Sequence, residues 1–186
     1  MCAIPLSFRE WCTAAMQSWT NRRAWAALPA AIAVVAALTL PAPQAWAASD
    51  ERSDTVGDAP GIIDIASFAV RNDNTRAVIT SHVPGLKTRG GFAFGYGHSR
   101  NGGLIVFARK HAGQLAVEAT YCGEIRCHDV DCAGLRVRWS TTKHIVQAII
   151  PQRCFPARLP SPGVFTATSG SKTDYDDAGV LRVARG

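Results

Sequence analysis

Beyond residue 47 the chain lacks methionine, has a single tryptophan, Trp139, and contains no block of like charge. This part holds seventeen Lys and Arg against thirteen Asp and Glu, a net charge of +4. Such a mild excess without a basic cluster argues against nucleic-acid binding. The same part also lacks the helical apolar period and a nucleophile signature such as Gly-x-Ser-x-Gly. We therefore expect no helical domain, no enzyme and no cofactor.

The first 47 residues have the pattern of an export signal. Arg22-Arg23 precede an uncharged apolar run over 24–40, and Ala45-Trp46-Ala47 offers small residues at a cleavage site. A transmembrane anchor needs about 20 apolar residues, and Pro29 interrupts this run. We predict a signal peptide over 1–47 and a secreted, extracellular protein with no membrane span after processing. Because a short basic segment begins at Met16, we take Met16 as the hypothetical true start.

Short β-rich runs alternate with turn signals after this leader. Residues 48–61 are polar and predict a flexible lead-in. The pattern beyond them predicts one all-β domain over 62–186, an antiparallel β-sandwich of about 7–9 strands, and we expect a monomer. The expected strands are 62–71, 76–83, 90–97, 104–110, 115–121, 135–139, 145–150, 164–168 and 180–184. The expected core is Phe68, Val70, Val78, Phe92, Phe94, Val106, Val117, Leu135, Val137, Ile149 and Phe165.

Four cysteines remain in the mature part: Cys122, Cys127, Cys132 and Cys154. They could hold zinc, but exported proteins oxidise their thiols, so we expect disulfides and no metal. If the turn between the expected strands 135–139 and 145–150 centres on Lys143, Trp139 pairs with Gln147 and Cys132 faces Cys154, with Cβ atoms roughly 4.5 to 5.5 Å apart. That pairing leaves Cys122 with Cys127. Four cysteines allow three connectivities, and we favour 122–127 with 132–154.

An aromatic stripe is the first candidate for ligand binding. Phe92, Phe94 and Tyr96 alternate with glycine and alanine in Gly91–Gly97, so they share one face of a strand. The stripe is either part of the core or a platform on which sugar rings stack. On the platform interpretation, Tyr96, His98 and Trp139 are the candidate ligand-binding residues.

Catalytic and metal-binding alternatives depend on side chains that the sequence leaves far apart. A small hydrolase would use His98 or His128 with an acid from the cysteine loop or from Asp174–Asp177. The acids of 174–177 offer hard oxygen donors for calcium, although they do not match the D-x-D-x-D-G loop. A solvated turn is the simpler interpretation, so no metal ligand is assigned and calcium binding at 174–177 stays open.

Several segments together resemble small secreted proteins of high-GC Gram-positive bacteria. They are Asp64-Ile65 opening a hairpin, Cys132-Ala-Gly-Leu-Arg-Val-Arg-Trp139, Ile145 to Pro151-Gln-Arg-Cys154, and Val183-Ala-Arg-Gly186. The general shape is similar to the β-sandwiches of DOMON domains and family-nine-like carbohydrate-binding modules. This resemblance implies a non-catalytic module that binds a sugar or haem. Because the chain beyond residue 47 has no methionine, a Met/His axial pair is impossible and only a His/His arrangement would remain, so haem is disfavoured.

The expected function is therefore a secreted binding module for an extracellular glycan or cell-envelope polymer. Two alternatives remain: the small secreted hydrolase, and a structural or inhibitory protein that acts through a protein interface.

Overall fold

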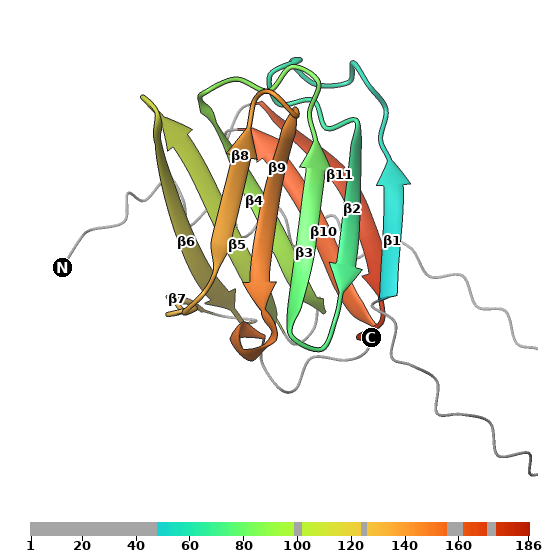
Figure 1. Ribbon diagram of the computed structural model, residues 1–186, viewed down its shortest axis with the longest axis vertical. Helices are drawn as coiled ribbons and strands as arrows, with labels where there is room; N and C mark the ends of the chain where they lie inside the picture. The colour runs from blue at the N-terminus through green and yellow to red at the C-terminus, as the bar shows by residue number, and fades with distance from the viewer. Residues whose placement is uncertain (1–47, 99–101, 124–125, 156–161, 171–173) are drawn as a thin grey trace, which may run out of the picture. The chain divides into compact units, whose positions relative to one another are not determined.

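The computed structural model describes residues 48–98, 102–123, 126–155, 162–170 and 174–186. The predicted signal peptide and Met16 lie outside these residues. The described strands are β1 (Ala48–Ser53), β2 (Ser67–Asn72), β3 (Arg76–His82), β4 (Gly90–His98), β5 (Gly102–His111), β6 (Gln114–Cys122), β7 (Cys127–Asp129), β8 (Arg136–Ser140), β9 (Ile145–Pro151), β10 (Gly163–Gly170) and β11 (Tyr175–Val183). A single 3-10 turn, η2 (Gln152–Cys154), follows β9 (Figure 1). None of the described helical residues forms a segment long and apolar enough to cross a membrane.

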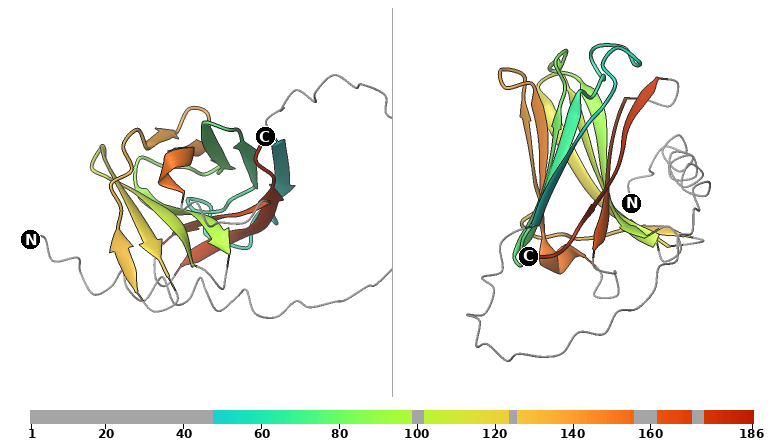
Figure 2. Two further views of the ribbon diagram at one scale, coloured as in Figure 1. Left: turned by 90° about the horizontal axis from the view of Figure 1, so that it is seen from below. Right: turned by 90° about the vertical axis from the view of Figure 1, so that its right-hand side faces the viewer.

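The strands form two antiparallel sheets that face each other as layers (Figure 2). One sheet has five strands in the order β1-β2-β3-β9-β8, and the other has six in the order β11-β10-β4-β5-β6-β7. The predicted all-β sandwich is confirmed. Eleven strands replace the expected seven to nine because β1 and β7 were not foreseen.

The core lies between the inner faces of the two sheets. Phe68 from the five-stranded sheet and Phe94 and Phe165 from the six-stranded sheet are fully buried. Most of the predicted core residues are buried or packed against the core, namely Phe68, Val70, Phe92, Phe94, Val106, Phe165, Val117, Leu135 and Val137. Val78 and Ile149 are the exceptions, because both lie half-buried on the outer face, and that part of the prediction is wrong.

The register of the β8–β9 hairpin explains the misplaced Ile149. The expected turn paired Trp139 with Gln147, but the structure pairs Trp139 with Val146 and Val137 with Ala148. A one-residue shift moves every side chain to the opposite face of a sheet. Ala148 and Ile150 therefore point into the core, and Ile149 points out. The turn closes with His144 at a φ of 54°, a left-handed conformation.

The flexible lead-in predicted over 48–61 is also corrected. Ala48–Ser53 pairs along its whole length with β2, from Ala48 opposite Asn72 to Ser53 opposite Ser67. Residues 54–66, part of which was expected to be strand, form instead a loop at the end of the sandwich where β1 ends. Within the described residues, the sandwich therefore already includes β1 from Ala48 onward and does not begin at residue 62.

The two ends of the sandwich differ in what closes them. The upper end of Figure 1 carries the loop 54–66, the loop 83–89 and the turn 141–144. The lower end carries the turn 73–75, β7, η2 and both disulfides. Cys122 is bonded to Cys127 with Cα atoms 4.0 Å apart, and Cys132 to Cys154 with Cα atoms 5.4 Å apart. The favoured disulfide pairing is confirmed.

Candidate functional site

The aromatic stripe of β4 belongs to the core. Tyr96 is only 9% exposed. Its ring packs against Phe155 at 4.1 Å and edge-on against Phe165 at 4.7 Å between centroids. Burial raises the pKa of its hydroxyl, and the Arg185 charge opposes that shift. With its ring enclosed in this way, Tyr96 does not form an exposed stacking platform, so the core interpretation of the stripe is confirmed and the platform interpretation is corrected.

Trp139 is half-buried and contacts both the core and the loop 83–89. Its ring meets Phe92 edge-on at 5.2 Å, and its Nε1–H donates a hydrogen bond to the Lys87 carbonyl at 2.8 Å. The Lys110 ammonium lies 6.0 Å from the ring centroid. These contacts hold the loop 83–89 against the sandwich. Much of the indole surface therefore packs against the protein itself.

The described residues do not place the histidines of the hydrolase alternative against a carboxylate. His98 ends β4 opposite Gly102, and its side chain is outside what the structure describes. His128 lies exposed on β7, with its ring 5.5 Å from that of Tyr121. Among the described residues, no hydrogen bond or ion pair joins a histidine side chain to a carboxylate.

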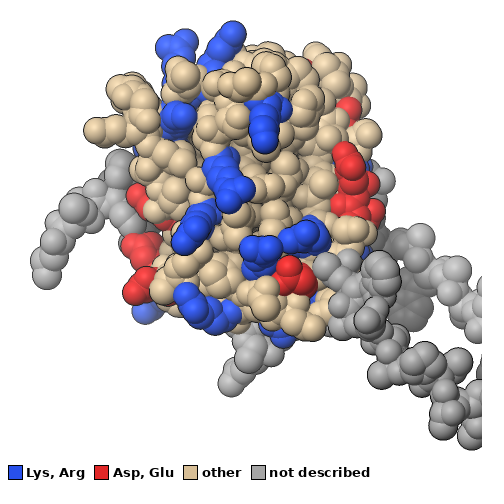
Figure 3. Space-filling model, in the orientation of Figure 1, with Lys and Arg blue, Asp and Glu red and all other residues tan. Residues whose placement is uncertain are grey.

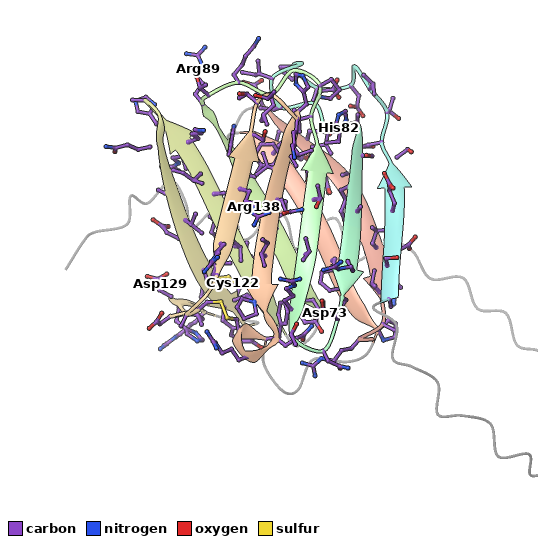
Figure 4. All side chains as sticks on the ribbon, in the orientation of Figure 1. Asp73, His82, Arg89, Cys122, Asp129 and Arg138 are labelled. Atoms are coloured by element: carbon purple, nitrogen blue, oxygen red, sulfur yellow. A yellow bond between two sulfur atoms is a disulfide. The ribbon has the colours of Figure 1, made fainter. Side chains whose placement is uncertain are left out.

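The outer face of the five-stranded sheet has the most distinctive surface chemistry. The strands β2, β3, β8 and β9 contain no Asp or Glu, and their exposed outward positions include several arginines. Figure 3 shows Lys and Arg as a broken band down this face, with acidic side chains toward its edges and lower end. The exposed outward arginines are Arg71, Arg76, Arg136 and Arg138. Figure 4 places Arg138 over the middle of the face.

The strand register fixes the order of side chains across this face. Arg136 lies opposite Ile149, Ile149 opposite Val78, and Val78 opposite Arg71. In the next row, Arg138 lies opposite Gln147, whose amide donates to the Thr80 hydroxyl at 2.9 Å. A strip made of Ile149, Val78, Gln147 and Thr80 thus lies between arginines on its two sides.

The cations on the two sides of the strip differ in how far they are neutralised. The Asp73 carboxylate lies 3.8 Å from the Arg71 guanidinium and 3.7 Å from that of Arg76. Arg136 and Arg138 make no hydrogen bond or salt bridge with the described residues. On the β8 side of the face, an anionic ligand would therefore not have to compete with a protein carboxylate for the arginines.

A second cluster lies at the upper end and is acidic. Asp58 and Asp64 from the loop 54–66 meet Asp176, the second residue of β11, with one carboxylate oxygen of each within 4.8 Å of the others. Asp176 accepts a hydrogen bond from the Ile65 N–H at 2.5 Å, and Asp64 accepts one from the Gly57 N–H at 2.9 Å. Asp64 and Asp176 are each 5% exposed, whereas Asp58 is exposed.

Burial and repulsion perturb two carboxyls at this end, those of Asp176 and Asp54. Burial raises the pKa of Asp176, the Ile65 hydrogen bond opposes the shift, and the charges of Asp54 and Asp58 raise it further. Burial likewise raises the pKa of Asp54, against a hydrogen bond from the Thr55 N–H. Both directions mean that negative charge on Asp176 and on Asp54 is disfavoured at this end of the sandwich.

Sequence reasoning found one member of this cluster only as part of the 174–177 segment. Asp176 is buried at the start of a strand, so the solvated-turn interpretation is wrong for it, while Asp177 accepts from the Gly179 N–H as such a turn would. Asp58 and Asp64 gave no signal because they lie more than 100 residues from Asp176. Only the packing of the loop 54–66 against β11 reveals the group.

No protein-family model, curated protein or solved structure matches the chain. The resemblance to DOMON-like and carbohydrate-binding sandwiches therefore stays a prediction.

Proposed function

We propose that the protein is an extracellular, non-catalytic binding module whose ligand is an anionic glycan or another anionic polymer of the cell envelope. The ligand lies across the outer face of the five-stranded sheet. The observation that carries this proposal is the absence of Asp and Glu from β2, β3, β8 and β9 together with the exposed, unpaired Arg136 and Arg138.

The spacing of the face suits an extended polymer. Arg136 and Arg71 are separated by three inter-strand steps, which is about 14 Å at the usual strand spacing. Half-buried Ile149 and Val78 lie between them and offer a flat apolar surface to the faces of sugar rings. Guanidinium groups bind carboxylate and phosphate oxygens through two parallel hydrogen bonds, which supplies the preference for an anionic ligand.

The compartment fits this proposal. Two disulfides are typical of exported domains, and a rigid β scaffold with both of them at one end can present a flat face without rearranging. Export through the predicted signal peptide would deliver the module to the envelope.

Co-sedimentation with purified cell walls tests the proposal. One wall sample keeps its anionic polymers and the other has had them removed by acid extraction. The purified protein should sediment with the first and not with the second, and its binding should weaken as salt is raised. The double variant Arg136→Gln/Arg138→Gln should bind at least about tenfold more weakly, the factor that corresponds to about 1.4 kcal/mol.

The matched control is Arg109→Gln/Arg182→Gln, which removes the same charge from the outer face of the six-stranded sheet. It should bind like the wild type. Equal losses in both double variants would show a non-specific charge effect and overturn the assignment of the face. A wild type that sediments with neither wall sample would overturn the function itself and favour the protein-interface alternative.

A further inference from the structure

The acidic cluster at the upper end contains a feature that ordinary folding does not explain. Asp64 is only 5% exposed, and of its two carboxylate oxygens only Oδ2 has a partner, the Gly57 N–H. Its Oδ1 is buried with no hydrogen bond. A buried polar atom without a partner is rare in folded proteins and destabilises them, and a charged one more so.

Asp54 repeats the pattern beside it. Its Oδ1 accepts from the Thr55 N–H, while its Oδ2 is buried without a partner. Asp54, Asp58, Asp64 and Asp176 thus gather four carboxyls around one end of the sandwich. Within the described ranges, no Lys, Arg or His forms a salt bridge with any of them. The Arg52 charge acts on Asp54 but forms no salt bridge with the group, so most of the negative charge is uncompensated. Asp64, which holds one of the unpaired oxygens, is also one of the three residues whose carboxylate oxygens lie within 4.8 Å of one another.

We propose that Asp58, Asp64 and Asp176 bind a calcium ion. All of the available donors are oxygen atoms, which favours a hard cation over zinc or copper. Calcium–oxygen distances of about 2.3 to 2.6 Å place oxygens on opposite sides of the ion about 4.6 to 5.2 Å apart. The 4.8 Å limit that encloses the three carboxylate oxygens fits within that sphere.

The form of the site favours calcium over magnesium. Asp58 and Asp64 come from an irregular loop, and calcium accepts irregular geometry with six to eight ligands, whereas magnesium requires a near-ideal octahedron. Exposed Asp58 leaves one side of the site open, so water completes the coordination. Buried Asp64 and Asp176 form the closed side.

The ion would act as a clamp. Two hydrogen bonds already join the loop 54–66 to the six-stranded sheet: the Ile65 N–H donates to Asp176, and the Ser169 hydroxyl donates to the Ile63 carbonyl. The loop also lies so close to Gly85 that a side chain there would collide with the Gly61 carbonyl. A cation shared by Asp58, Asp64 and Asp176 adds ionic bonds between the same two elements. Its binding is independent of any ligand on the five-stranded sheet.

Calcium titration of the chelator-treated protein, by calorimetry and by thermal unfolding, tests the proposal. We expect one site with a Kd on the order of 10⁻⁴ to 10⁻³ M, the range of extracellular modules. At about tenfold excess over that Kd, calcium should raise the Tm by roughly 3 to 8 °C. Magnesium at the same concentration should raise it less.

Two variants and one control locate the ion. Asp64→Asn should abolish the calcium-dependent rise in Tm. Asp58→Asn removes an exposed ligand without disturbing the core, so it should keep the fold and bind calcium about tenfold or more weakly. Asp129→Asn, at the lower end, should respond to calcium like the wild type. An unchanged wild-type Tm and no binding heat would overturn the proposal, as would equal calcium responses in Asp64→Asn and Asp129→Asn. A larger effect of magnesium would overturn the assignment to calcium.

Discussion

At the lower end of the sandwich, the buried amides Asn72 and Gln152 bond to each other and to their surroundings, whereas at the upper end Asp54, Asp64 and Ser81 each bury an oxygen with no partner. The Gln152 amide donates to the Asn72 side chain at 2.6 Å and to the Asp73 carbonyl at 2.8 Å. Its carbonyl accepts from the Arg185 guanidinium at 2.7 Å. Figure 4 shows Asp73 and Cys122 at the lower end and His82 and Arg89 at the upper end.

This difference shows that the two ends of the sandwich are stabilised by different interactions. Within the described residues, the lower end is complete in itself, because none of its buried side-chain polar atoms lacks a partner and two disulfides close its loops. The upper end depends on a loop whose charges repel one another. The lower end should therefore be sensitive to any loss of a side chain, and the upper end should respond mainly to charge and to added cations.

The largest effect is expected from the longer disulfide at the lower end. Replacing both Cys132 and Cys154 by Ser releases a loop with a sequence separation of 22, which lowers the free energy of unfolding by about 3.4 kcal/mol in the chain-entropy model. Removing Cys122 and Cys127 in the same way releases a separation of only 5 and should lower it by about 2 kcal/mol. Denaturant unfolding of both double variants measures the difference. A greater loss from the shorter bridge would show that strain or local packing, and not loop length, decides the effect.

The next effect comes from the polar network. Gln152→Ala leaves the side-chain oxygen Oδ1 of Asn72 and the Arg185 guanidinium without their Gln152 partner, and it should lower the free energy of unfolding by about 2 kcal/mol. Gln147→Ala is the matched control, because Gln147 is half-buried on the outer face and bonds only to Thr80 among the described residues. It should lower the free energy of unfolding by less than about 1 kcal/mol. Equal losses would mean that the buried network at the lower end stabilises the fold no more than a single half-buried hydrogen bond does.

The same contrast explains what the sequence could predict. The disulfide pairing was predictable because Cys122 and Cys127 are close in sequence and because Cys132 and Cys154 flank one hairpin. The aromatic stripe was likewise assignable to one face by strict alternation. Both signals are local, and the lower end and the core are built largely from such signals.

Other features depend on contacts between segments that are distant in sequence, which no local pattern can predict. The polar segment 48–53 is a strand only because β2 offers it an edge, so composition alone suggested a flexible lead-in. Val78 and Ile79 are adjacent and both apolar, so alternation could not choose which faces inward. The arginines of the candidate binding face align only in the actual strand register. The acidic cluster joins residues 58, 64 and 176, which are brought together only by the folded loop.

At the upper end a conservative change should stabilise the protein. Without calcium, Asp64→Asn removes one repelling charge, keeps an oxygen to accept the Gly57 N–H, and adds an N–H that can donate to a neighbouring carboxylate. We expect the free energy of unfolding in chelator to rise by about 1 kcal/mol. Asp129→Asn, the control at the other end, should change it by less than about 0.5 kcal/mol. A clear loss of stability in Asp64→Asn under these conditions would show that the upper end, like the lower, already uses this carboxylate fully.

The smallest effect concerns Asp73, a lower-end carboxylate that is fully used. It accepts hydrogen bonds from the Thr75 hydroxyl at 2.6 Å and from the backbone N–H groups of Thr75 and Arg76, each at 2.8 Å. The Thr75 hydroxyl bond is the largest cause of a pKa held below the ordinary Asp value of 3.8, with the two backbone bonds and the Arg76 charge acting in the same direction. Because the folded-state pKa is lowered, ionised Asp73 adds stability above the unfolded-state pKa, and this stability is lost as pH falls through the folded-state pKa.

Asp73→Asn keeps an acceptor in the turn between β2 and β3 and removes only the charge. Near neutral pH it should lower the free energy of unfolding by about 0.5 kcal/mol, the usual size for partly exposed charge interactions. The difference between variant and wild type should begin to shrink below about pH 4 and vanish at lower pH, once Asp73 is protonated in both folded and unfolded wild type. Unfolding curves of both proteins between pH 7 and pH 2 measure it. A difference that stays constant to the lowest pH would mean that the amide disturbs the turn itself and that the charge of Asp73 contributes nothing to the stability of the lower end.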